Sequence, residues 1–182
     1  MGVLFLDEPG FPKDVNNKLY TCDWTSGKVF SFEMEAKDAT YKIKQNVFTT
    51  LTRATDLDVD GESNLYFSDW LGGKFAYAGQ EKPVSRIFKA KLKGYKAPAV
   101  PDLKSANDND LVKHIIGPSA SIRLQAQQFL LQKPISKQAN QLLSNAALNK
   151  KLSINSRTAA LFTLKQAIGE KSHSLCQKLL AD

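Results

Sequence analysis

The sequence predicts a chain of two parts, in which antiparallel β-propeller blades are followed by an α-solenoid. A ten-residue phrase, LYTCDWTSGK at 19–28, returns as LYFSDWLGGK at 65–74, a spacing of 46 residues. Apolar residues alternate as in strands before residue 95 and recur at helical spacing after residue 107. These patterns predict a partial propeller of about two blades at 1–94, a linker at 95–107 and helical repeats at 108–182.

Seven short strands are predicted within the first part. They are expected at 11–15, 19–23, 28–34, 41–51, 56–59, 65–67 and 84–88, with turns at 60–64 and 70–73. Four strands in about 46 residues match the length of one propeller blade. Because a propeller ring needs about four to eight blades, the sequence indicates the tail of a longer protein. Residues 1–5 would then be the last strand of a preceding blade, or a closing strand.

Five helices are predicted within the second part. They are expected at 111–116, 122–130, 136–148, 153–168 and 172–180. Ser136 can cap the third helix, Ser153 or Asn155 can cap the fourth, and Gly169 can end it. The pattern R-x-x-A-x-x-x-L at 123–130 returns at 157–164, a spacing of 34 residues. Paired short helices at this period predict an α-solenoid.

Charge divides the chain in the same way. Residues 1–95 balance 13 basic against 13 acidic side chains, whereas 96–182 hold 12 basic and 5 acidic, so the whole net charge of +7 lies in the second half. The lysines there are dispersed, and Phe129 and Phe162 are the only clear aromatics, which favours a solvated surface over a nucleic-acid interface. No apolar run approaches the ~20 residues that a membrane span needs. The two cysteines, Cys22 and Cys176, lie in unrelated segments and predict neither a disulfide framework nor a zinc site.

Three motifs carry a family resemblance. R-x-x-D-L-x-V-D-G at 53–61, L-Y-x-x-D-W at 65–70 and R-I-F at 86–88, followed by a linker and helices, resemble the C-terminal part of bacterial membrane-bound dehydrogenase-like proteins. These are propellers of the glucose/sorbosone dehydrogenase type with NHL-like blades, followed by HEAT-like repeats. The resemblance implies a periplasmic or extracellular protein, a c-type haem domain beyond the helices, and quinone-dependent oxidation of a sugar or alcohol. It implies pyrroloquinoline quinone and calcium as cofactors, although the sequence shows neither an export signal nor a haem motif.

Candidate binding residues lie in loops that a propeller would bring to one mouth of its channel. An arginine there could bind an anionic cofactor or substrate, and indoles could stack on a ring. The alternative is structural: the repeated aspartate caps its own turn, and the repeated tryptophan packs between sheets. The candidate cofactor-binding residues are Asp23, Trp24, Arg53, Asp56, Asp69 and Trp70. The D-x-D-x-D-G run at 56–61 resembles the start of a calcium loop, but Phe67 stands where an EF-hand needs its bidentate glutamate, and no metal ligand is assigned.

Two functions of different class follow. In one, the chain is a fragment of a propeller oxidoreductase, inactive alone because missing blades would complete its site. In the other, it is a non-catalytic scaffold that holds partners. A protein partner is expected at the helical repeats, a small sugar or alcohol is a further candidate ligand, and nucleic acid is not expected.

Overall fold

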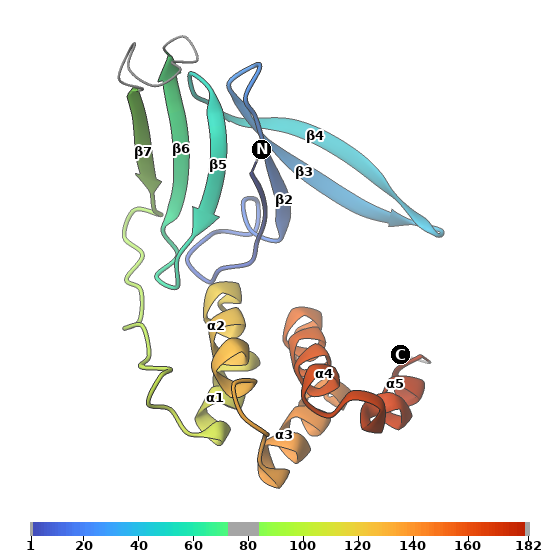
Figure 1. Cartoon of the computed structure of the whole chain (residues 1–182). Helices are drawn as coiled ribbons and strands as arrows, with labels where there is room; N and C mark the ends of the chain where they lie inside the picture. The colour runs from blue at the N-terminus through green and yellow to red at the C-terminus, as the bar shows by residue number, and fades with distance from the viewer. Residues whose placement is uncertain (1, 73–83, 181–182) are drawn as a thin grey trace, which may run out of the picture. The chain divides into compact units, whose positions relative to one another are not determined.

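The structure, a computed structural model, describes residues 2–72 and 84–180, and the chain folds into two compact units (Figure 1). We name Met1–Pro98 the sheet unit and Ala99–Asp182 the helical unit. The strands are β1 (Val3–Leu6), β2 (Lys18–Asp23), β3 (Lys28–Lys37), β4 (Thr40–Thr50), β5 (Ala54–Val59), β6 (Leu65–Gly72) and β7 (Val84–Ala90). The helices are α1 (Asp108–Ile115), α2 (Ala120–Leu130), α3 (Lys137–Leu148), α4 (Ile154–Ile168), the 3₁₀ turn η1 (Gly169–Ser172) and α5 (His173–Leu179).

The sheet unit contains two antiparallel sheets, with strand orders β1-β2-β3-β4 and β5-β6-β7. The repeated phrase begins in β2 of the first sheet and in β6 of the second, so its two copies occupy corresponding strands. The sheets share one apolar core, to which the first contributes Leu6 and Tyr20 and the second Leu57 and Phe67. Strands β3 and β4 continue outward as a long hairpin (Figure 1).

The strand predicted at 11–15 is wrong, because this segment turns back on itself. The Pro12 carbonyl accepts hydrogen bonds from the Val15 and Asn16 amides at 3.0 and 2.8 Å, and Asn17 has a φ of 55°. The buried Tyr20 hydroxyl holds the turn by donating to the Val15 carbonyl at 2.6 Å. The place beside β2 is taken by β1, which pairs with it directly. The predicted turn at 70–73 is also wrong as far as Gly72, where β6 ends, and residue 73 lies outside the described residues.

The five helices predicted from periodicity and capping are confirmed. The Ser136 and Ser153 hydroxyls accept hydrogen bonds from the Ala139 and Ser156 amides at 3.2 and 3.1 Å, which satisfies amides that the first turn leaves unpaired. Gly169 ends α4 with a φ of 57°. Inward-facing side chains from all five helices form one core that includes Leu111, Ile115, Leu130, Leu143, Leu164 and Leu175.

The predicted fold class, propeller blades followed by HEAT-like repeats, is wrong. The described strands form sheets of four and three and close no ring, so the chain is a small mixed structure of sheets and helices. In a solenoid each repeat contacts only its neighbours. Here the buried side chains of all five helices belong to a single core, and no repeat solenoid is evident in the described residues.

The R-x-x-A-x-x-x-L pattern that recurs after 34 residues has a local explanation. Arg123 Nη1 donates to the Gly117 carbonyl and Arg157 Nε donates to the Ala147 carbonyl, both at 2.9 Å. Each arginine thus bonds a carbonyl at or just past the C-terminal end of the preceding helix, where backbone acceptors lack intrahelical partners. The shared pattern therefore reflects helix capping and does not produce a repeat solenoid.

Candidate functional site

Two tryptophans and an arginine from separate segments of the sheet unit form one cluster. Trp24 follows β2, Trp70 lies in β6, and Arg53 immediately precedes β5. The indole centroids are 5.5 Å apart with the rings inclined by 33°, and the Arg53 Cζ atom lies 4.8 Å from the Trp24 centroid and 5.6 Å from the Trp70 centroid. A guanidinium at these distances from a ring face is stabilised by about 0.5–2 kcal/mol per ring, depending on how far it is desolvated. We call these three residues the Trp–Arg–Trp cluster.

Asp69 fixes the backbone from which Arg53 projects. Its side chain is 2% exposed, and its carboxylate accepts hydrogen bonds from the Arg53 amide at 2.7 Å and the Thr52 amide at 3.2 Å. The Arg53 carbonyl in turn accepts from the Trp70 amide at 3.1 Å. Both main-chain groups of Arg53 are therefore bonded to the strand that carries Trp70. Asp69 acts as a positioning residue, since its two oxygens are occupied by backbone amides.

The half-buried Arg53 guanidinium remains available on its hydrogen-bonding edge. Its recorded contacts with the described residues are the two indole faces, and none is a hydrogen bond or ion pair from the side chain. Guanidinium carries five N–H donors in a planar fork that matches a carboxylate or phosphate. The cluster therefore presents a cation that packs against two neighbouring rings and has donors that no described residue engages.

Asp23 caps the turn that follows β2. Its carboxylate accepts from the Thr25 amide at 2.9 Å and from the Ser26 hydroxyl at 2.7 Å, and the hydrogen bond from Ser26 holds the pKa of Asp23 below its usual value. This geometry corresponds to the turn-capping alternative considered for Asp23. Its oxygens orient the loop that carries Trp24.

Asp56 lies apart from the Trp–Arg–Trp cluster. It is exposed, its Oδ1 accepts from the Leu57 amide at 2.9 Å, and it lines a shallow pocket of about 160 Å³ with Tyr66, Ser68 and Ile87. The pairing of β5 with β6 shifts register between Ala54 and Asp56. A bulge of this kind changes which face the following side chains occupy. Asp23 and Asp69 hold the segments that carry the cluster, whereas Asp56 has no such role in the hydrogen bonds described.

The carboxylates of the D-x-D-x-D-G run do not fit a calcium ion. Asp58 accepts from the Val59 amide at 2.8 Å, while Asp60 accepts from the Asn64 amide at 2.8 Å and from the Tyr66 hydroxyl at 2.9 Å. Burial alone would raise the pKa of Asp60, but the hydrogen bonds from Asn64 and Tyr66 lower it. Calcium takes six to eight converging oxygens. No group of three or more His, Cys, Asp or Glu side chains in residues 2–72 and 84–180 could hold a metal ion.

No family model and no curated protein matches the chain. Because the described residues form two small antiparallel sheets and one helical core, the resemblance to membrane-bound dehydrogenase-like propellers is wrong. The calcium that this resemblance implies finds no matching set of ligands among residues 2–72 and 84–180. Within the described residues, no helix is long and apolar enough to cross a membrane.

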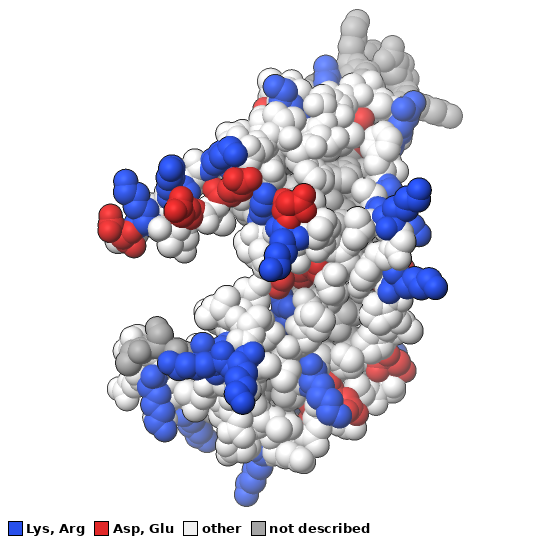
Figure 2. Space-filling view, turned by 180° about the vertical axis from the view of Figure 1, so that it is seen from behind, with Lys and Arg blue, Asp and Glu red and all other residues white. Residues whose placement is uncertain are grey.

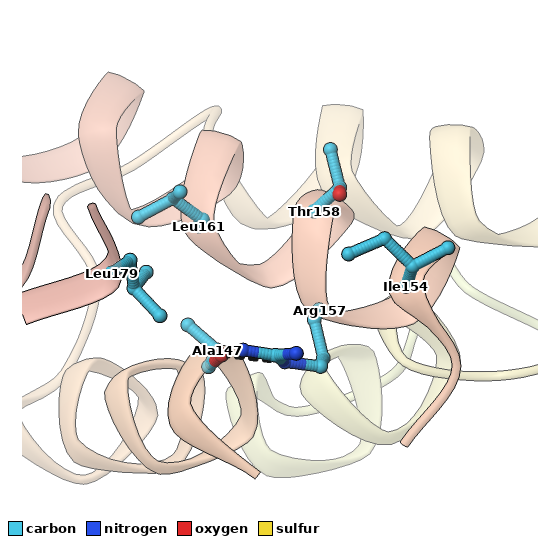
Figure 3. Close-up of a pocket in the computed structure, with 6 residues that line it drawn as sticks. All are labelled: Ala147, Ile154, Arg157, Thr158, Leu161 and Leu179. Atoms are coloured by element: carbon cyan, nitrogen blue, oxygen red, sulfur yellow. Dashed lines mark hydrogen bonds between the residues drawn. The ribbon is translucent and has the colours of Figure 1, made fainter. Parts of the chain in front are cut away.

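A second candidate site, in the helical unit, was not predicted. A pocket of about 210 Å³ is lined by Ala147 of α3, by Ile154, Arg157, Thr158 and Leu161 of α4, and by Leu179 of α5 (Figure 3). In the close-up, the Arg157 side chain lies beside Ala147, and Leu161 and Leu179 face each other across the opening. The spacing of residues 154, 158 and 161 was the available signal, because positions i, i+4 and i+7 share one face of a helix.

Proposed function

We propose that this chain is a non-catalytic binding module with two sites. The Trp–Arg–Trp cluster would hold the carboxylate group of a small planar ligand, and the helical unit would bind a protein. The observation that carries the first part is the Arg53 guanidinium, which lies 4.8 and 5.6 Å from two indole centroids with its hydrogen-bonding edge unused by the described residues.

Carboxylate recognition follows from the geometry of the arginine. A guanidinium fork bonds a carboxylate through two parallel N–H groups, and such charge-assisted pairs are shorter and roughly twice as strong as neutral hydrogen bonds. Trp24 and Trp70 add faces on which a planar ligand can stack. Because Asp69 and the Trp70 amide hold the backbone of Arg53, little ordering is needed when the ligand arrives.

The proposal assigns no chemical step to the cluster. Its three side chains are a cation and two indoles, and the neighbouring carboxylates of Asp69 and Asp23 are engaged by backbone amides and a serine hydroxyl. The oxidation of a sugar or alcohol expected from the sequence, and the exported location, stay predictions.

Tryptophan emission gives a direct test, since both indoles belong to the cluster. We would titrate the full chain with benzoate at constant ionic strength and use benzamide as the neutral analogue. Benzoate should change the emission with a dissociation constant of about 1 mM or lower, equivalent to about −4 kcal/mol. Benzamide should bind at least tenfold more weakly, because it has no carboxylate to accept two hydrogen bonds from the charged guanidinium.

A matched pair of variants separates the arginine from general charge effects. Arg53→Gln keeps the backbone bonds to Asp69 and Trp70 and should weaken benzoate binding at least tenfold. Arg86→Gln, an exposed arginine of β7 in the same unit, should leave it unchanged. Equal responses to benzoate and benzamide, or undiminished binding by Arg53→Gln, would refute the carboxylate site.

Protein binding by the helical unit rests on the pocket between α3, α4 and α5. A concave site with mainly apolar walls is the usual place for an inserted side chain. Ile154, one of its lining residues, is a large apolar side chain that is mostly exposed.

A further inference from the structure

Helix α4 leaves two large apolar side chains exposed. Its fully buried positions are Ser156, Ala160, Thr163 and Leu164. On its outer surface, Ile154 is 68% exposed and Phe162 is 59% exposed. A helix that is apolar on both sides is normally covered on both sides.

Exposed apolar side chains also occur at the ends of the neighbouring helices. Leu148 at the end of α3 is 41% exposed, Leu180 just past α5 is 87% exposed, and both follow pocket residues, Ala147 and Leu179, in the chain. Contiguous apolar surface around a concavity marks interaction sites more often than scattered single residues do. We name the pocket together with Leu148, Phe162 and Leu180 the α4 groove.

The surroundings of the α4 groove are basic. From Arg123 to Leu180 the sequence holds nine lysines and arginines, and Glu170 is the only acidic residue. Lys151 lies just before α4, Lys165 one turn after Leu161, and Lys178 directly before Leu179. In the helical part of the face shown in Figure 2, Lys and Arg side chains predominate over acidic ones.

We infer that the α4 groove binds an acidic amphipathic helix of another protein, with apolar side chains in the pocket and carboxylates toward the lysines. The inference rests on the proposal that the helical unit binds a protein, and is independent of the Trp–Arg–Trp cluster. The walls favour a peptide over nucleic acid because four of the six lining residues, Ala147, Ile154, Leu161 and Leu179, are apolar and suit apolar side chains better than phosphates. The concavity favours inserted side chains over a flat lipid surface. A helix that binds in a groove inserts apolar side chains spaced at i, i+3, i+4 and i+7.

The test uses the full chain and a fluorescein-labelled peptide of roughly 15–20 residues, with leucine at i, i+3, i+4 and i+7 and glutamate elsewhere. Peptides of the same pattern with lysine or glutamine in place of glutamate serve as comparisons. Anisotropy should show binding of the acidic peptide at least tenfold tighter than of the basic one. The preference should weaken as ionic strength rises, because exposed charges are screened.

Variants locate the binding surface. Ile154→Asp should weaken binding of the acidic peptide at least tenfold, and the double variant Lys151→Glu with Lys178→Glu should weaken it about tenfold at low salt. Leu124→Asp, at a residue of α2 that is 55% exposed and outside the pocket, and Lys137→Glu, at the first residue of α3, should leave it unchanged. Circular dichroism of each variant establishes that the helices are retained.

The outcomes separate the inference from the proposal beneath it. Binding of the neutral or basic peptide that Ile154→Asp abolishes would overturn the acidic partner but keep protein binding by the helical unit. Absence of binding by all three peptides would overturn both. Tighter binding to anionic lipid vesicles or duplex DNA, lost in the same variants, would overturn the peptide partner in favour of that ligand.

Discussion

Gly27 lies in the loop that carries Trp24 and contacts the backbone of the segment that carries Arg53. Its φ is +68°, its carbonyl accepts from the Leu51 amide at 2.7 Å, and a Cβ atom placed on it would lie 2.6 Å from the Thr52 carbonyl oxygen and closer still to that of Leu51. Replacing Gly27 with alanine therefore imposes two separate penalties. One is the left-handed backbone, and the other is displacement of two main-chain carbonyls.

The two penalties can be estimated separately. A left-handed φ costs a non-glycine residue about 1–2 kcal/mol, of which the reduced entropy of the unfolded chain offsets about 0.4–1 kcal/mol. Displacing well-packed groups costs about 1–3 kcal/mol. Gly27→Ala should therefore lower the free energy of unfolding by roughly 1–5 kcal/mol. Gly94 has a φ of +84° with nothing within 4 Å of its Cβ position, so Gly94→Ala should show only the backbone part, about 1 kcal/mol.

Urea unfolding followed by tryptophan emission measures both variants, because both indoles lie in the sheet unit. The difference between the two variants isolates the carbonyl displacement. Equal destabilisation by Gly27→Ala and Gly94→Ala would show that the loop and the Leu51–Thr52 segment are not in contact. The benzoate response should also weaken in Gly27→Ala, since Trp24 and Arg53 are held together through this contact.

Two further predictions concern pH and helix capping. Burial and then the charge of Asp56 raise the pKa of the Cys22 thiol to about 11, and burial and then Asp14 raise the pKa of the Tyr20 hydroxyl to about 12. Their contribution to stability is fully present below the unfolded pKa values of 9.0 and 10.0 and is lost as pH rises through the folded values. The urea midpoint of the sheet unit should therefore fall above about pH 9, and less steeply in Tyr20→Phe; a midpoint that rises over this range would contradict it. Ser153→Ala removes the cap of α4 and should lower the stability of the helical unit by about 1 kcal/mol in thermal unfolding followed by circular dichroism, whereas Ser174→Ala, at an exposed serine of α5, should not; equal shifts would contradict the capping role.

Local patterns identified most of the elements, and non-local geometry decided the rest. Residues 19–23 and the helix capped by Ser136 follow from periodicity and capping, which neighbouring residues determine. The turn at Pro12 and the choice of β1 as the partner of β2 depend on which segment reaches that edge, and sequence spacing does not reveal this. Ring closure and helix stacking are equally non-local, and the fold class inferred from the two repeats was wrong for that reason.

The candidate site was predictable where it depends on strand equivalence. Trp24 and Trp70 recur at the same offset of a repeated phrase, and the structure brings them together with Arg53. Asp56 lies outside the cluster, and this could not be predicted because the register shift in β5 is not visible in the alternation of apolar residues. The pocket beside α4 was missed because residues of three helices, α3, α4 and α5, line it, and the spacing of residues along one helix does not show which other helices pack beside it.

The backbone hydrogen bonds of Arg53 fix one of the distances within the Trp–Arg–Trp cluster. Arg53 and Trp70 are tied through Asp69 and through the Trp70 amide, so their separation is set within one sheet. Trp24 belongs to the other sheet, and its distance from Arg53 depends on how the two sheets are spaced. A shift of one sheet against the other would thus change the distances of Trp24 from Arg53 and from Trp70, while the separation of Arg53 and Trp70 would stay nearly constant.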